Sequence, residues 1–296
     1  MRQSCSRYYV NSEYKLLKAV LLYIPGPEVG QVASPKDVLY LRGIDFEAVS
    51  KEYENILELY RKLKIRVYLI DDKLKKQKDD QSFLNMMYTR DLFFMTSEGT
   101  IMSNMAHKVR RGEVFYAETA LKEIGVPIIF RISGDGTFEG ADALWVNEKL
   151  VAVGIGNRTN VKGYEQVRQA LENIHIRCVS VPVLSHTIHL LGAVQFVDSR
   201  VALVRTEVVD NDVINLLKDN NIDIVSVPEN KEVRERYAMN IVVVAQKKII
   251  MPANCLQTKR IYQNHGIEVV AETAIDQLIN GGGGLGCATG VISRER

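Results

Sequence analysis

The sequence predicts an α/β protein in which five strand–strand–helix–strand units close into a propeller-like ring. Short β-branched runs recur along the chain, and each follows a segment with the apolar spacing of a helix. A second class of strand-like segments precedes those helices. The runs start 45 to 61 residues apart, and a repeat of this length indicates a solenoid or a closed radial array. No leucine-rich, tetratricopeptide or WD signature is present, so we expect the ring.

The elements follow one another in the same order in each predicted unit. The helical pattern is clearest in residues 46–63, where Val49, Tyr53, Ile56 and Tyr60 lie on one face. The runs after the helices are residues 65–70, 126–130, 176–183, 222–227 and 267–271. The strands before the helices are expected at residues 19–24, 92–95 with 100–102, 143–153, 194–205 and 240–251. Helix C-terminal ends are expected at Gly125, Asn173, Asn221 and Gly266.

Composition excludes several classes of protein. The chain has 296 residues, of which 46% are hydrophobic and 25% charged, with a net charge of +2. This balance gives no case for binding nucleic acid or a membrane, and the basic run 73–78 is flanked by acids, as in a solvated loop. No stretch rich in proline, glycine or serine divides residues 1–296, so we expect one domain. There is no C-x-x-C pair, signal-like segment or membrane-length apolar stretch, and a cytoplasmic location is the expectation.

The strongest chemical signal is Cys287 within the sequence GGGGLGCATG, residues 281–290. Consecutive glycines cost backbone entropy on folding, so close approach or a positive φ is expected there. A phosphate-binding loop would need Lys where Cys287 stands. A flexible segment with an incidental cysteine is the alternative.

Three other segments carry candidate partners for a thiol. His186 and His189 stand between strand-like runs, and histidine can serve a thiol as base or acid. A zinc site at these histidines lacks a defined third ligand. Glu139 and Asp142 in FEGAD, and Asp91 in TRD, are carboxylates suited to a planar cation. Taken singly, each is more often an ordinary core or loop residue.

Together, these segments resemble the guanidino-modifying enzymes of the pentein superfamily, which include arginine deiminases, dimethylarginine dimethylaminohydrolases, agmatine deiminases and amidinotransferases. The order is TRD, FEGAD, HL and finally GGGLGC, with further likeness at residues 12–28 and 156–160. The resemblance implies a five-fold pseudo-symmetric α/β-propeller of ββαβ units around a central cavity. The number of units predicted above agrees with it independently.

The resemblance also implies roles for individual residues. Cys287 matches the nucleophile, His189 the proton shuttle and Glu139 the carboxylate that partners it. The substrate-binding residues are expected to be Asp91 for the guanidinium, Arg158 and Arg110 for an α-carboxylate, and Asp142. Asp142 and Asn240 are interpreted as supporting residues. Leu191 departs from the His-x-Asp pattern of arginine deiminases and amidinotransferases, and indicates that the guanidino group is bound less tightly or is substituted.

The expected function is therefore hydrolysis of a guanidino group through a covalent thiouronium on Cys287, giving a ureido product and ammonia or an amine. The alternatives are transfer of the amidino group to an amine acceptor and a non-catalytic binding protein of the same fold. The expected partner is a small guanidino substrate, and no metal or organic cofactor is expected. A homo-oligomer is left open by the sequence.

Overall fold

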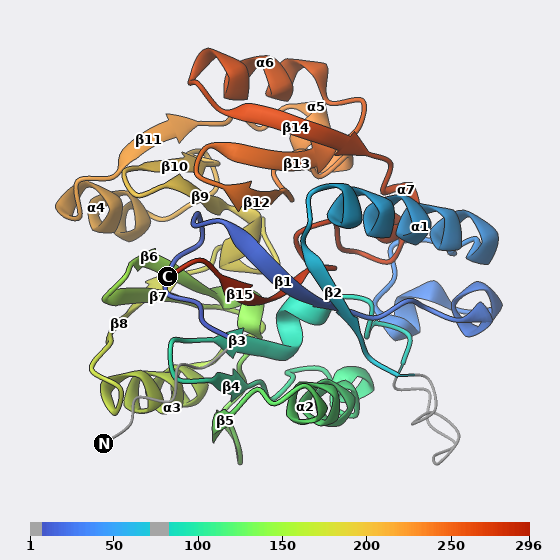
Figure 1. Cartoon of the computed structure of the whole chain (residues 1–296), viewed down its shortest axis with the longest axis horizontal. Coiled ribbons are helices and arrows are strands. Elements are labelled where there is room, and N and C mark those ends of the chain that lie inside the picture. The colour runs from blue at the N-terminus through green and yellow to red at the C-terminus, as the bar shows by residue number, and fades with distance from the viewer. Residues whose placement is uncertain (1–7, 72–82) are drawn as a thin grey trace.

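A computed structural model describes residues 8–71 and 83–296 of the chain. Cys5 and the basic run 73–78 lie outside the described residues. Five three-stranded sheets are arranged around a centre, and Figure 1 shows helices α1, α2, α3, α4 and α6 at the periphery of the molecule. The predicted ring of five units is confirmed. Within the described residues, no helix has the length and apolar character needed to cross a membrane.

Every sheet has the same internal pairing. A middle strand pairs antiparallel with one neighbour and parallel with the strand that follows the helix. The strands after the helices are edge strands and are only partly buried, whereas middle strands such as β7 are buried on both faces. Four sheets take their strands in chain order: β3 (Phe93–Met95), β4 (Thr100–Met102) and β5 (Ile128–Arg131); β6 (Ala143–Asn147), β7 (Leu150–Ile155) and β8 (Arg177–Pro182); β9 (Val194–Asp198), β10 (Val201–Val204) and β11 (Asp223–Ser226); β12 (Val242–Ala245), β13 (Lys248–Pro252) and β14 (Glu268–Thr273).

The remaining sheet joins the two ends of the described chain. Strand β1 (Leu17–Leu22) pairs in parallel with β2 (Arg66–Leu69) and antiparallel with β15 (Gly290–Arg294). The blue strand β1 and the red strand β15 lie side by side in Figure 1. Sequence reasoning expected only one strand before the first helix and did not find β15, which directly follows the glycine–cysteine segment.

The helices begin and end as the sequence chemistry favours. The main helices are α1 (Phe46–Lys62), α2 (Glu113–Glu123), α3 (Val161–Glu172), α4 (Asn211–Asp219) and α6 (Leu256–Asn264), with two short helices, α5 (Lys231–Glu235) and α7 (Asp276–Asn280). Asp45 caps α1 by accepting a 2.8 Å hydrogen bond from the backbone N–H of Ala48. Gly125, Asn221 and Gly266 adopt positive φ after their helices. In the third unit, Asn173 is the C-cap of α3 but stays right-handed, and His175 takes the positive φ instead.

Candidate active site

A cavity of about 380 Å³ opens between the loops that precede the first strands of the sheets. Five of the predicted site residues line this cavity: Asp91, Arg110, Arg158, His189 and Cys287. Glu139 and Asp142 do not, and lie behind the lining. Segments separated by almost 200 residues of sequence thus meet at one place, as the resemblance implied.

The units place these side chains at corresponding positions. Asp91 belongs to the 3-10 helix η4 (Thr89–Leu92), which leads into β3. Glu139 and His189 are the N-cap residues of η6 (Gly140–Asp142) and η7 (Leu190–Gly192), which lead into β6 and β9. Cys287 precedes β15 in the same way. The pseudo-symmetry of the ring therefore directs one polar side chain from each of these units toward the centre.

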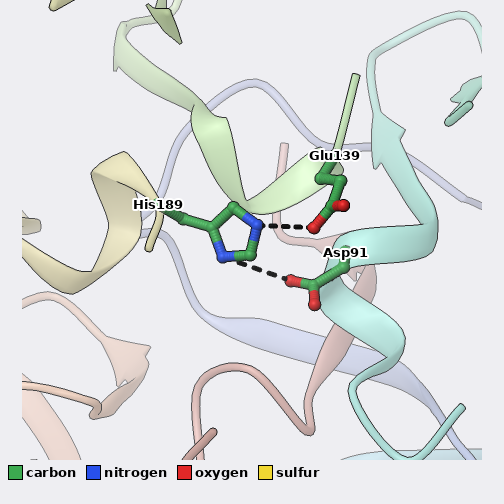
Figure 2. A group of neighbouring side chains, drawn as sticks. All are labelled: Asp91, Glu139 and His189. Atoms are coloured by element: carbon green, nitrogen blue, oxygen red, sulfur yellow. Dashed lines mark hydrogen bonds and ion pairs between the residues drawn. The ribbon is translucent and has the colours of Figure 1, made fainter. Parts of the chain in front are cut away.

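Glu139 and His189 form a buried pair. Figure 2 shows the His189 ring between two carboxylates, with Nε2 2.7 Å from Glu139 Oε2 and Nδ1 3.8 Å from Asp91 Oδ1. Burial alone would lower the pKa of His189, but the negative charges of Asp91, Asp142 and Glu139 outweigh it and raise the pKa. Burial opposes ionisation of Glu139, yet the hydrogen bond and charge of His189, followed by Arg110 and Arg158, lower its pKa. The pair is therefore an imidazolium beside a carboxylate.

Asp91 presents one oxygen to the protein and one to the site. Its Oδ2 is 2.6 Å from Arg110 Nη1, whereas its buried Oδ1 has no hydrogen-bond partner among the described residues. His189 Nδ1, at 3.8 Å, is too far from this oxygen for a hydrogen bond, and a buried carboxylate oxygen without one is costly unless a ligand supplies it. Asp91 Oδ1 is thus suited to accept a hydrogen bond from a guanidinium N–H, consistent with the expectation for this residue.

Arg110 does not have the surroundings expected of a residue that binds a substrate carboxylate. Its side chain is 96% buried, and its guanidinium contacts Asp91 at 2.6 Å and Glu113 at 2.9 Å. Further hydrogen bonds reach the carbonyl oxygens of Asn85 and Tyr88. Asp91 already neutralises this cation, and Glu113 accepts a hydrogen bond from it. We therefore propose that Arg110 orients Asp91 and does not bind a substrate carboxylate.

Arg158 is a cation at the cavity that is less firmly engaged than Arg110. It follows β7 and lines the cavity, and its side-chain contact among the described residues is a long one, 3.4 Å from Nη1 to Glu139 Oε1. Asp142, in contrast to Arg158, is fully engaged by hydrogen bonds within the protein. Its two oxygens accept hydrogen bonds from the Thr159 hydroxyl (2.6 Å) and the Leu190 backbone N–H (3.0 Å). Since both oxygens are engaged behind the cavity, Asp142 supports the loop that carries His189 and does not face a substrate.

Cys287 has a protonated thiol in this unliganded arrangement. Burial raises the pKa of Cys287 to about 11, and the negative charge of Asp91 adds to the rise. A hydrogen bond from Asn240 Nδ2 to the sulfur, 3.0 Å long, acts in the opposite direction. A cation placed beside Asp91 would cancel the charge that disfavours the thiolate.

The same carboxylates and imidazole have the composition of a metal site. One ligand atom from each of Asp91, Glu139 and His189 lies within 4.8 Å of the other two. Arg110 Nη1, however, is 2.6 Å from Asp91 and 3.7 Å from Glu139, so a divalent cation would meet a guanidinium at close range. The group is better suited to proton transfer and to binding an organic cation. His186 also lines the cavity but is not part of this group.

Two further residues shape the site; sequence reasoning assigned no role to Tyr88 and indicated only a supporting role for Asn240. Tyr88 lies under the glycine run, where its hydroxyl donates to the Leu278 carbonyl at 2.7 Å and a side chain at Gly283 would collide with its ring. Asn240 stands before β12, at the position that Asp91, Glu139, His189 and Cys287 occupy in their own units. Alignment of the five repeats around their first strands would have pointed to Asn240.

Comparisons with known proteins agree with this architecture. YkgA, an uncharacterized protein of Bacillus subtilis, is 24% identical over 290 residues, which cover 94% of this chain and 92% of that protein. The N(G),N(G)-dimethylarginine dimethylaminohydrolase of Streptomyces coelicolor is 26% identical over 184 residues, covering 62% of this chain and 66% of the Streptomyces protein. The aligned part thus spans slightly less than two thirds of that enzyme.

A solved structure shares the fold. DDAH from Pseudomonas aeruginosa, as a cysteine-to-serine mutant complexed with citrulline, has a TM-score of 0.74 and 20% identity, over 95% of this chain and 100% of that chain. Residues 42–294 match the protein family described as "N,N dimethylarginine dimethylhydrolase, eukaryotic", a match over most of the chain. The chain is therefore a member of the pentein superfamily and belongs to the N,N-dimethylarginine dimethylhydrolase family.

Proposed function

We propose that this chain hydrolyses the guanidino group of an arginine derivative, with Cys287 as the nucleophile. One observation carries the proposal: Cys287, His189 and Asp91 line a single cavity, with Glu139 hydrogen-bonded to His189 behind it. A thiol, a proton carrier and an unsatisfied carboxylate oxygen are the groups that this reaction requires. Membership of the N,N-dimethylarginine dimethylhydrolase family supports the same reaction.

The cavity favours a guanidino group that carries an apolar substituent. Asp91 Oδ1 can accept a hydrogen bond from one guanidinium nitrogen. Leu191 lines the cavity where the His-x-Asp pattern of related deiminases would supply a second acid. An apolar wall is better matched to an N-methyl group than to a second N–H, which would lose its hydration without gaining an acceptor. We therefore propose an N-alkylated arginine as the preferred substrate.

The first half of the reaction forms a covalent adduct. When the guanidinium binds beside Asp91, its positive charge lowers the pKa of the Cys287 thiol and favours the thiolate. The thiol proton passes to solvent, which later protonates the released amine. The sulfur adds to the central carbon, which already carries the electrophilic charge. The imidazolium of His189 then gives its proton to the departing amine, and a thiouronium remains on Cys287. Glu139 holds the ring in place throughout.

The second half returns the enzyme to its starting state. His189, now neutral, accepts a proton from a water molecule that attacks the thiouronium carbon. The C–S bond breaks, the hydroxyl proton of the tetrahedral intermediate passes to the departing sulfur, and the ureido product leaves with Cys287 again a thiol. The raised pKa of His189 keeps the ring protonated near neutral pH, so a proton is available in the first half, and His189 recovers one in the second half.

The proposal is tested with a panel of guanidino compounds: arginine, mono- and dimethylarginines, agmatine and guanidino acids, each with wild-type protein and Cys287→Ser. Mass spectrometry should detect a ureido product and a matching amine for a methylated arginine with the wild type alone. Addition of glycine or ornithine distinguishes an amidinotransferase, because that activity would depend on the acceptor. No covalent adduct and no turnover with any compound would refute the proposal and leave a binding protein of this fold.

A further inference from the structure

The fifth unit also directs a polar side chain toward the centre of the ring. Asp91, Glu139, His189 and Cys287 each precede the first strand of a unit, and all four have a part in the proposed reaction. Asn240 stands at the same place in the remaining unit, before β12, and it lines the cavity. Asn240 is therefore the one residue at these five corresponding positions for which the reaction has no role yet.

The side-chain amide of Asn240 contacts Cys287 at two points. Its Nδ2 group donates to Cys287 Sγ at 3.0 Å, and its Oδ1 accepts from the Cys287 backbone N–H at 3.0 Å. The backbone of Asn240 is itself fixed, because its N–H donates to the Tyr237 carbonyl at 2.7 Å. A rigid amide in contact with both ends of one residue leaves that residue little freedom of orientation.

The glycine-rich segment is shaped around Asn240. A Cβ atom at Gly284 would lie 2.8 Å from Asn240 Cγ, and one at Gly286 would lie 3.1 Å from its Oδ1. Two glycines of the run thus allow the backbone to approach this amide closely. The sequence indicated that another group approaches the backbone of the glycines closely. In the structure, that group at these two glycines is the side chain of Asn240.

We infer that Asn240 is a catalytic residue, which aims the sulfur of Cys287 at the substrate and donates a hydrogen bond to the thiolate as it forms. This inference rests on the proposed function, in which Cys287 is the nucleophile. Hydrogen bonds to a charged sulfur are stronger than those to a neutral thiol, so the contact favours the reactive form. It opposes the effects of burial and of Asp91, both of which disfavour the thiolate.

Asn240→Asp tests the inference because it keeps the shape of the side chain. The carboxylate can still accept from the Cys287 N–H, whereas the donor to the sulfur is lost. Asn147→Asp is a matched control, since Asn147 also accepts from a backbone N–H, that of Lys149, and donates through Nδ2, to Asn220, away from the cavity. The rate of Cys287 alkylation by iodoacetamide is measured against pH by mass spectrometry of the Cys287 peptide.

The thiol of Asn240→Asp should titrate at least about one pH unit higher than the wild type, and alkylation near neutral pH should fall on the order of 10- to 100-fold. Turnover should show the loss in kcat with little change in KM. Asn147→Asp should match the wild type in both measurements. Unchanged thiol titration and unchanged kcat in Asn240→Asp would overturn the inference, even if the wild-type protein is an active hydrolase.

A measurement on the wild-type protein covers the case in which Asn240→Asp fails to fold. With asparagine labelled by ¹⁵N, the side-chain amide signal of Asn240 should shift with pH as Cys287 ionises, and this shift should vanish in Cys287→Ser. An amide signal that is independent of the thiol would overturn the inference. Both the alkylation and the NMR experiment need no substrate, so their outcome is distinct from a failure to find turnover.

Discussion

Replacement of Arg110 by methionine separates the role that the structure assigns to it from the role that the resemblance implied. The change keeps most of the side-chain volume and removes the cation. Arg110 is 3% exposed and contacts Asp91 at 2.6 Å and Glu113 at 2.9 Å. Loss of one partner from such a buried pair costs about 3–5 kcal/mol. At about 2 °C per kcal/mol for a chain of this size, the melting temperature should fall by roughly 6–10 °C.

The pH dependence of this effect has a definite sign. Burial raises the pKa of Glu113, and Arg110 opposes the rise. Without Arg110, the pKa of Glu113 lies higher still, so the folded variant binds protons at a higher pH than the folded wild type. Because the pKa of Glu113 is about 8 in the wild type, its contribution to the deficit should appear above about pH 8 and be largest at alkaline pH, and it should vanish at lower pH, where Glu113 is protonated in both folded proteins.

Thermal unfolding monitored by circular dichroism, at several pH values, measures both effects. Arg111→Met is the matched control, because the neighbouring Arg111 is exposed and makes only a 3.4 Å contact with the Met105 carbonyl. If Arg110→Met were as stable as the control and raised KM only for substrates that carry a carboxylate, Arg110 would be a substrate-binding residue and the reasoning from its buried partners would be wrong.

Three further predictions follow from the site. Cys287→Ser should abolish turnover without loss of fold, because a serine hydroxyl is ionised far less than a thiol; residual turnover would contradict a covalent mechanism. Arg158→Ala should raise KM for a methylated arginine on the order of 10- to 100-fold and change it little for agmatine, and an equal loss for both would remove Arg158 from carboxylate binding. Since the pKa of Cys287 is raised to about 11, alkylation by neutral iodoacetamide should still increase above about pH 9, whereas a cationic chloroacetamidine should react readily near neutral pH; a plateau for iodoacetamide near neutral pH would contradict the raised pKa.

The fold could be predicted largely because each unit repeats the same change of hydrophobic period. Strands buried on both faces, such as β7, and helices with one apolar face, such as α1, give distinct patterns that recur five times. Strand β15 was not predicted from the sequence, because its partner β1 lies at the other end of the sequence. Local patterning cannot identify a pairing between segments so far apart, and Gly290 within β15 weakens its strand signal.

The site could be predicted less completely, for a different physical reason. Residue type and order were enough to single out Cys287, His189, Glu139 and Asp91 as one group. The function of a cation, by contrast, depends on what surrounds it. Arg110 and Arg158 look alike in sequence, yet one lies among buried acids and the other beside open space. The environment that distinguishes them is created only by the folded chain.

Closure of the ring and assembly of the site are one structural event. The backbone N–H of Arg90 donates to the carbonyl of Cys287 at 3.1 Å, so the helix that carries Asp91 is bonded directly to the nucleophile's segment. The hydroxyl of Thr89 lies 2.9 Å from the Leu21 carbonyl of β1, 2.9 Å from the Ala288 carbonyl, and 2.9 Å from the Gly290 N–H of β15. These contacts connect the segment of Asp91 to both paired strands, β1 and β15. Asp91 and the Cys287 sulfur are thus held relative to each other by the fold itself. If they have the proposed roles, this arrangement lowers the entropic cost of bringing nucleophile and carbon together.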